Sequence, residues 1–212
     1  MPGALLFDLD GTLVDSRRDI ADGVNFTLEQ LGRPTLSVDS VARMVGDGVR
    51  QLLIRAAGPL DDVTMKHALD LFLPHYLEHC TDTTVLYPGV IETLESFEGR
   101  ALAVVTNKPT AHTEKTLRAT GLAGYFSVVI AGDTLPTRKP DPEPLWEALR
   151  RLGSPRDSAV MVGDSPLDIR AARSAGVRAA AVTYGFRPGS DLSALSPDYL
   201  IGSLAELREV LS

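Results

Sequence analysis

The sequence predicts an α/β fold, a Rossmann-like parallel sheet core with an inserted helical domain. Short apolar runs of the kind typical of buried parallel strands alternate with helical periodicity through the second half of the chain. Residues from about 15 to 83 show helical spacing and turns but no convincing strand. Strands that alternate with helices favour a parallel sheet with right-handed crossovers. We therefore expect residues 1–14 and 84–212 to form the α/β core and residues 15–83 to form the insertion.

Composition and charge narrow the class of protein. The 212 residues are 44% hydrophobic and 23% charged, as in ordinary globular proteins. The net charge is −7 and no basic patch stands out in the sequence, which disfavours nucleic-acid binding. The single cysteine, Cys80, excludes an intramolecular disulfide. The apolar N-terminus lacks a basic flank, so it does not resemble a signal peptide. No run approaches the ~20 apolar residues of a membrane span. We expect a cytoplasmic protein without a membrane partner.

The first strand is expected to begin at Ala4 and to end in two acids, Asp8 and Asp10, where Gly11 turns the chain. Two carboxylates at the end of a buried strand repel each other and lose hydration. A cation would remove this conflict, and Mg²⁺ suits hard oxygen ligands. Taken alone, such a pair is more often a solvated loop or a helix cap.

The inserted segment is predicted to be a helical bundle. Gly32 and Pro34 end its first helix, and Gly46 and Gly48 break the chain again. The expected helices are residues 20–31, 37–45, 49–57 and 64–80.

After the insertion the α/β rhythm resumes. Expected strands are residues 100–107, 127–131, 158–164 and 177–183, with a short edge strand at 199–201. Expected helices are residues 90–97, 110–120, 142–152, 168–175 and 204–211, and residues 188–197 are expected to form a loop.

Polar residues follow the predicted strands. The predicted strand 100–107 ends in Thr106 and Asn107, and the predicted strand 158–164 ends in Asp164, with Ser165 directly after it. Lys139 lies in the connection between the predicted strands 127–131 and 158–164. Each residue alone has a plain alternative as a cap, a turn or a solvated loop. In parallel sheets, however, ligands bind beyond the carboxyl ends of the strands. Together these residues predict one common site.

The string from Phe7 to Ser16 resembles the first motif of the haloacid dehalogenase-like (HAD) superfamily. Thr106, Lys139 and the pattern Gly163-Asp164-x-x-x-Asp168 resemble the remaining motifs of that superfamily. The resemblance covers the whole core and implies the HAD fold, with the inserted helices as a cap domain. It also implies a phosphatase that requires Mg²⁺ and acts on a small-molecule phosphate ester.

The resemblance further implies roles for single residues. Asp8 would be the nucleophile that forms an aspartyl-phosphate, and Asp10 would be the general acid and base. Mg²⁺ would be held by Asp8, Asp164 and the backbone carbonyl of Asp10. Thr106 would donate a hydrogen bond to a phosphoryl oxygen, and Lys139 would offset the negative charge on Asp8 and the phosphate.

Supporting roles follow from the same resemblance. Asp168, with Ser165 beside it, would orient Lys139 or a metal-bound water without binding the metal itself. Gly11 and Thr12 would hold the phosphate-binding loop. Asn107 would face the substrate.

The branch of the superfamily is indicated by the insertion. Dehalogenases lack the second acid of the first motif, whereas this chain has Asp10 there. Ile20 stands where β-phosphoglucomutases carry a histidine. The stretch from Gly46 through Gly48 to Arg50 resembles phosphoglycolate phosphatases, which implies 2-phosphoglycolate as substrate. The plain alternative for these glycines is a helix–helix turn.

Two further substrate contacts are predicted. Arg50 is a candidate partner for a substrate carboxylate. Lys108 faces the substrate or is solvated.

Other functions remain open at this point. One alternative is a pyrophosphatase, or a sugar-phosphate phosphatase or phosphoglucomutase-like enzyme, on the same core. Another is a non-catalytic phosphate-binding regulatory protein. The intact set of Asp8, Asp10, Lys139 and Asp164 disfavours the latter, because a pure binder needs no nucleophile. The sequence does not determine the oligomeric state.

Overall fold

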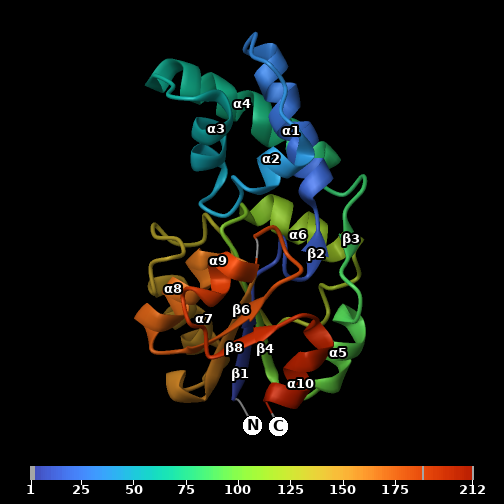
Figure 1. Cartoon of the computed structure of the whole chain (residues 1–212), viewed down its shortest axis with the longest axis vertical. Helices are drawn as coiled ribbons and strands as arrows, with labels where there is room; N and C mark the ends of the chain where they lie inside the picture. Colours follow the sequence, from blue (N-terminus) through green and yellow to red (C-terminus); the bar gives the residue numbers. More distant parts are fainter. Residues whose placement is uncertain (1–2, 188, 212) are drawn as a thin grey trace.

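The chain is divided into an α/β part and a layer of helices that covers one end of it (Figure 1). The structure is a computed structural model and describes residues 3–187 and 189–211. Residues 1, 2, 188 and 212 of the predicted core, including the start of the predicted 188–197 loop, lie outside the described residues. Within the described part, none of the helices combines the length and the apolar character needed to cross a bilayer.

A six-stranded parallel sheet forms the centre of the α/β part, in the order β5-β4-β1-β6-β7-β8. Its strands are β1 (Ala4–Phe7), β4 (Ala101–Val105), β5 (Val128–Ile130), β6 (Ala159–Gly163), β7 (Arg178–Val182) and β8 (Tyr199–Ile201). The α/β fold predicted from the sequence is therefore confirmed. Strands β4 and β5 lie on one side of β1, and the later strands β6, β7 and β8 lie on its other side. Parallel sheets bind ligands at such a switch in strand order.

The register of the three central strands sets the position of the acids. Phe7 pairs with Val104 of β4 and with Val162 of β6. Residues that follow these three positions therefore leave the sheet at one level, on the same edge.

Alternating side chains of the strands bury both faces of the sheet. Leu5 and Phe7 belong to the core cluster on one face, and Ala4 and Leu6 belong to the cluster on the other. Helices α5 (Val90–Ser96) and α10 (Leu207–Val210) cover the first face, and α7 (Glu143–Leu152), α8 (Pro166–Ala175) and α9 (Gly189–Ser193) cover the second. Helix α6 (Thr110–Ala119) follows β4, and single 3₁₀ turns span Arg156–Ser158 and Leu204–Glu206.

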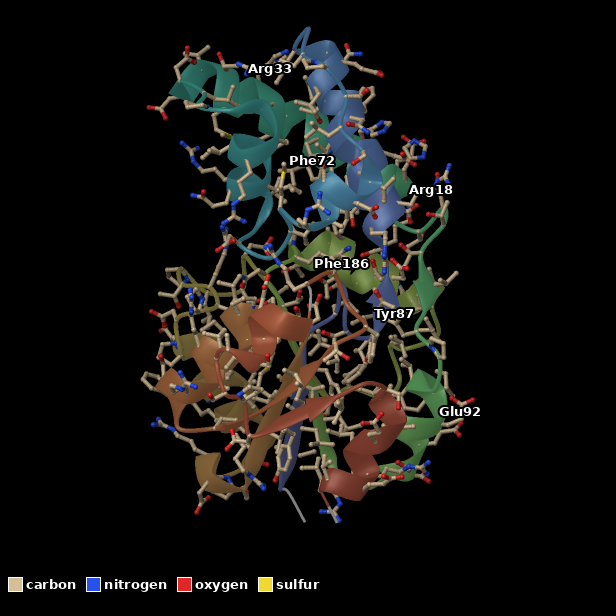
Figure 2. The ribbon with its side chains drawn as sticks, viewed as in Figure 1. Arg18, Arg33, Phe72, Tyr87, Glu92 and Phe186 are labelled. Atoms are coloured by element: carbon tan, nitrogen blue, oxygen red, sulfur yellow. The ribbon has the colours of Figure 1, made fainter. Side chains whose placement is uncertain are left out.

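The remaining helices pack around an apolar cluster of their own, and we call them the helical layer. They are α1 (Arg17–Gln30), α2 (Val38–Ala42), α3 (Val49–Ala57) and α4 (Asp62–His79). Helix α4 continues through Pro74. Phe72 lies inside this layer, whereas Phe186 comes from the α/β part and joins the cluster from the boundary (Figure 2).

The two chain crossings between the parts lie side by side. Strand β2 (Val14–Asp15) pairs antiparallel with β3 (Val85–Leu86). The buried Asp19 carboxylate accepts hydrogen bonds from the backbone N–H groups of Thr83 and Thr84, each at 2.9 Å. The pairing of β2 with β3 is not predicted from the sequence, because two-residue strands are too short to show alternation.

Candidate active site

A cavity that is partly open to solvent lies between the carboxyl edge of the sheet and the helical layer. Its floor and walls include Asp8, Asp10, Thr106, Asn107, Lys108, Asp164 and Ser165 from the α/β part, and Ile20, Gly46, Gly48, Val49, Leu52, Phe72 and Tyr76 from the helical layer. The structure thus brings together most of the site residues predicted from the sequence.

Asp8 follows β1 and contacts a buried lysine. The Lys139 ammonium lies 3.0 Å from Asp8 Oδ1 and 2.6 Å from Asp168 Oδ1. Burial raises the pKa of the Asp8 carboxyl to about 6, although Lys139 opposes the shift. Burial alone lowers the pKa of Lys139, but Asp168 and Asp8 outweigh it and raise that pKa. Lys139 therefore stays charged and counterbalances the acids.

Asp168 is fixed by the start of helix α8. Its Oδ2 accepts hydrogen bonds from the Ser165 backbone N–H at 3.0 Å and from the Ser165 hydroxyl at 2.6 Å, which forms a capping box. Its other oxygen accepts from Lys139. Asp168 thus orients Lys139 toward Asp8.

Asp164 lies in a closely packed pocket at the end of β6. Its Oδ2 accepts a hydrogen bond from the Phe186 backbone N–H at 2.6 Å. A Cβ atom on Gly11 would come within 2.2 Å of Asp164 Oδ2, and one on Gly185 would come within 2.3 Å of Asp164 Cβ. Gly11 also has φ +84°, so the position favours glycine for two reasons.

The carboxylates of Asp8, Asp164 and Asp168 offer oxygens that lie within 4.8 Å of one another. Both Asp168 oxygens already accept hydrogen bonds, from Lys139 and from Ser165, so Asp8 and Asp164 are the better candidates for metal ligands. Burial, together with Asp8 and Asp168, raises the pKa of Asp164 well above its usual value. Two hard oxygen donors in a crowded acidic pocket fit a small divalent cation.

Asp10 has a buried lysine of its own. Its Oδ1 accepts hydrogen bonds from the Ser16 hydroxyl at 2.6 Å and from the Lys108 ammonium at 2.9 Å. The same ammonium donates to the Tyr76 hydroxyl of α4 at 2.7 Å. Burial alone lowers the pKa of Lys108, but Asp10 and Tyr76 outweigh it and raise that pKa. Lys108 is thus buried and charged, and the solvated alternative does not hold.

Thr106 and Asn107 differ in what they offer to a ligand. Thr106 lines the cavity, and its hydroxyl accepts a hydrogen bond from the Lys108 backbone N–H at 3.2 Å. The Asn107 amide donates to Gly46 O and Lys139 O, each at 2.8 Å, and accepts from Lys139 N at 3.0 Å. Asn107 therefore joins the helical layer to the Lys139 loop, and its amide is already occupied.

Three residues assigned to the substrate or to the phosphate-binding loop do not line the cavity. Gly11 packs against Asp164 instead, and Thr12 is fully buried. Arg50 does not line the cavity: its side chain is 52% exposed, with Nη2 3.3 Å from Asp62 Oδ1. Helical spacing explains this, because Val49 and Leu52 turn one face of α3 to the cavity and Arg50 lies off that face.

Among the cavity residues that the sequence does not single out are Tyr76, Phe186 and Arg187. Tyr76 lies on a helix where it looks like an ordinary core residue. Phe186 and Arg187 follow β7, and Arg187 Nη2 donates to Val45 O of the helical layer at 3.0 Å. Their position after a predicted strand was the available signal, since every strand of this sheet ends at the same edge.

The chain is similar to known proteins over nearly its whole length. A family model described as haloacid dehalogenase-like hydrolase matches residues 5–182. A phosphoglycolate phosphatase of Colwellia psychrerythraea is 39% identical over 212 residues, which covers 96% of this chain and 94% of that protein. A phosphoglycolate phosphatase of Nitrosococcus oceani is 38% identical and covers 100% of this chain and 97% of that protein.

Solved structures share the fold over the full length. The crystal structure of a predicted phosphoglycolate phosphatase from Haemophilus somnus superposes with a TM-score of 0.91 and 34% identity. The match covers 99% of this chain and 98% of the other.

Proposed function

The chain belongs to the haloacid dehalogenase-like hydrolase family, and on this basis we propose that it is a Mg²⁺-dependent phosphatase that hydrolyses 2-phosphoglycolate. The observation that carries the proposal is the pairing of two cavity acids with two separate buried lysines. Asp8 contacts Lys139, and Asp10 contacts Lys108. One acid can thus serve as nucleophile while the other handles protons.

In the first step, the Asp8 carboxylate attacks phosphorus and the bond from phosphorus to the leaving oxygen breaks. An aspartyl-phosphate forms on Asp8. Asp10 gives its proton to the leaving oxygen, which departs as an alcohol. The Thr106 hydroxyl donates to a phosphoryl oxygen, and the Lys139 ammonium offsets the charge that spreads over the phosphoryl group.

In the second step, Asp10 takes a proton from a water molecule, whose oxygen attacks the phosphorus of the aspartyl-phosphate. Inorganic phosphate leaves and the Asp8 carboxylate is restored. Asp8, Asp164 and the backbone carbonyl of Asp10 are the proposed holders of Mg²⁺, which supplies positive charge for the phosphoryl oxygens when it is bound.

We further propose that the helical layer is a cap domain that spans residues 15–83. It closes the cavity through contacts such as the one between Asn107 and Gly46 O. Closure excludes bulk water and strengthens the electrostatic interactions inside. The full-length similarity to proteins named phosphoglycolate phosphatase supports 2-phosphoglycolate as the substrate.

A panel of phosphate esters tests the function directly. The panel contains 2-phosphoglycolate, sugar phosphates, pyrophosphate and an aryl phosphate, compared by kcat/KM in Mg²⁺. We expect 2-phosphoglycolate to give the highest value. A higher value for pyrophosphate or a sugar phosphate would replace the proposed substrate, and no turnover of any ester would refute the phosphatase.

Metal removal is expected to abolish turnover and Mg²⁺ to restore it, because the acids of Asp8 and Asp164 repel each other without a cation. Ca²⁺ is expected to inhibit, since its looser shell lets Asp8 bind through both oxygens and blunts it as a nucleophile. The measurement is activity after exhaustive chelation and after each ion is added back. Full activity in the chelated enzyme contradicts the metal assignment.

Arg50→Ala is expected to leave the choice of substrate unchanged, because Arg50 is paired with Asp62 outside the cavity. The measurement is the ratio of kcat/KM for 2-phosphoglycolate to that for a neutral aryl phosphate. We expect a change within about twofold, as for an exposed ion pair. A selective tenfold loss would instead place Arg50 at the substrate in a conformation other than this one.

A further inference from the structure

Lys108 presents a buried ammonium group to the cavity. Its side chain is 3% exposed, and its Nζ lies 2.9 Å from Asp10 Oδ1, 3.2 Å from Asp10 Oδ2 and 2.7 Å from the Tyr76 hydroxyl. A lysine ammonium has three N–H donors. Two of its three hydrogen bonds go to the one carboxylate of Asp10, and the longer of these, at 3.2 Å to Oδ2, is the donor that a ligand oxygen can take over while the bonds to Asp10 Oδ1 and Tyr76 remain.

The wall that faces Lys108 offers little else to an anion. Ile20, Val49, Leu52 and Phe72 make the helical side of the cavity largely apolar. Burying a carboxylate against such a wall is costly unless a cation or a hydrogen-bond donor accompanies it. Among the described residues that line the cavity, Arg187 is the other cation: its Nη2 donates to Val45 O, whereas its buried Nε has no hydrogen-bond partner in the described part of the chain, so Arg187 is the competing candidate.

We propose that Lys108 binds the carboxylate of the leaving group and thereby determines the preference for phosphate esters of small hydroxy acids. This inference rests on the proposed phosphatase function and names the residue that recognises its substrate. Lys108 replaces Arg50 in that role.

The geometry around Asp10 supports this assignment. The leaving oxygen must come within hydrogen-bond reach of Asp10 to be protonated, about 2.6–3.2 Å. Lys108 Nζ contacts the same carboxylate, so the leaving oxygen and the ammonium are both immediate neighbours of Asp10. In glycolate a single methylene carbon separates the leaving oxygen from the carboxylate. The carboxylate therefore comes to the ammonium, whose positive charge compensates the negative charge of the carboxylate.

Tyr76 acts as a positioning residue for Lys108. Its hydroxyl belongs to α4 of the helical layer and holds the ammonium from the side opposite the α/β part. The Tyr76 ring centroid also lies 4.9 Å from Lys108 Nζ, within cation–π distance. The carboxylate subsite is thus complete only when the helical layer is in its closed position.

Lys108→Met tests the proposal with a matched pair of substrates. The pair is 2-phosphoglycolate and 2-hydroxyethyl phosphate, which differ in whether the leaving group carries a carboxylate. We expect both kcat/KM values to fall through the lost contact with Asp10. The ratio of the first value to the second should fall a further 10- to 100-fold or so, the range for hydrogen bonds to a charged group.

Two variants are matched to Lys108→Met. Lys115→Met removes an α6 lysine that donates to Leu77 O outside the cavity, and it should leave the ratio unchanged. Arg187→Met removes the other cavity cation. Equal losses on both substrates in Lys108→Met would mean that Lys108 acts only through Asp10, and a ratio that falls in Arg187→Met alone would assign the carboxylate to Arg187. Either result overturns the proposal.

Tyr76→Phe provides a second test that keeps the buried lysine and the ring. It should lower the same ratio by a few-fold, because the ammonium loses one of its two holders, and circular dichroism should show an unchanged fold. If Lys108→Met does not fold, an unchanged ratio in Tyr76→Phe overturns the proposal. Wild-type enzyme that hydrolyses both esters equally well refutes the role of Lys108 alone, whereas enzyme that hydrolyses neither refutes the phosphatase function.

Discussion

Asp8→Asn is expected to lower kcat by at least about 10³-fold, because an amide is a poor nucleophile and the covalent step depends on this side chain. Asparagine keeps nearly the same shape, and its carbonyl oxygen can still accept a hydrogen bond from Lys139, which contacts Asp8 Oδ1 at 3.0 Å. The fold should survive, since the apolar residues of β1 and not Asp8 form the core beneath the site. The loss is therefore one of chemistry.

The measurement combines steady-state turnover with acid quenching of the enzyme during turnover of a ³²P-labelled ester. Wild-type enzyme should trap label on protein, and Asp8→Asn should trap none. Thermal melting serves as the control for folding. Retention of more than a few per cent of wild-type activity, once deamidation back to aspartate is excluded by mass spectrometry, removes Asp8 from the nucleophile role.

Asp10→Asn is expected to lower turnover by about 10²–10⁴-fold, the usual contribution of general acid–base catalysis. Asparagine retains an oxygen that can accept from Ser16 and Lys108, so the local contacts should largely persist. The first step should suffer less with an aryl phosphate, because a phenolate leaves without prior protonation. The second step should suffer with every substrate, because the attacking water loses its base.

These two effects predict a particular time course. With an aryl phosphate, Asp10→Asn should release about one equivalent of phenol in a burst and then turn over slowly, as the aspartyl-phosphate accumulates. With an alkyl phosphate the burst should be absent. Equal losses on both esters, measured where phosphoryl transfer limits both, would argue against Asp10 as the general acid.

The α/β core was predictable because its signals are local. Continuous apolar runs such as the one before Asp8 are typical of buried parallel strands, and β1, β4, β6 and β7 lie where those runs predict them. Acids and polar residues at the run ends then predict a shared edge, since parallel strands end together. The pair of β2 and β3 was not predictable, because pairing between residues 14 and 86 leaves no periodicity in two-residue strands.

The functional residues of the insertion were harder to predict, because helical periodicity identifies the apolar face of a helix but not the element that packs against that face. Arg50 follows a glycine turn that resembles a substrate loop, yet the rotation of α3 turns it to solvent and Asp62. Tyr76 has the spacing of a core residue, and only the packing of α4 over α6 brings its hydroxyl to Lys108.

The sequence by itself determined the family resemblance, the order of the six core strands along the chain, and the acids and the Lys139 loop at the edge of the sheet. These depend on local pattern and on the rule that parallel strands share one carboxyl end. Only the tertiary structure decided that each acid contacts its own lysine, that Asn107 ties the Lys139 loop to Gly46, and that Lys108 is buried. The physical reason is that burial and charge pairing depend on what residues distant in the chain place around a group, as Tyr76 and Asp10 do around Lys108.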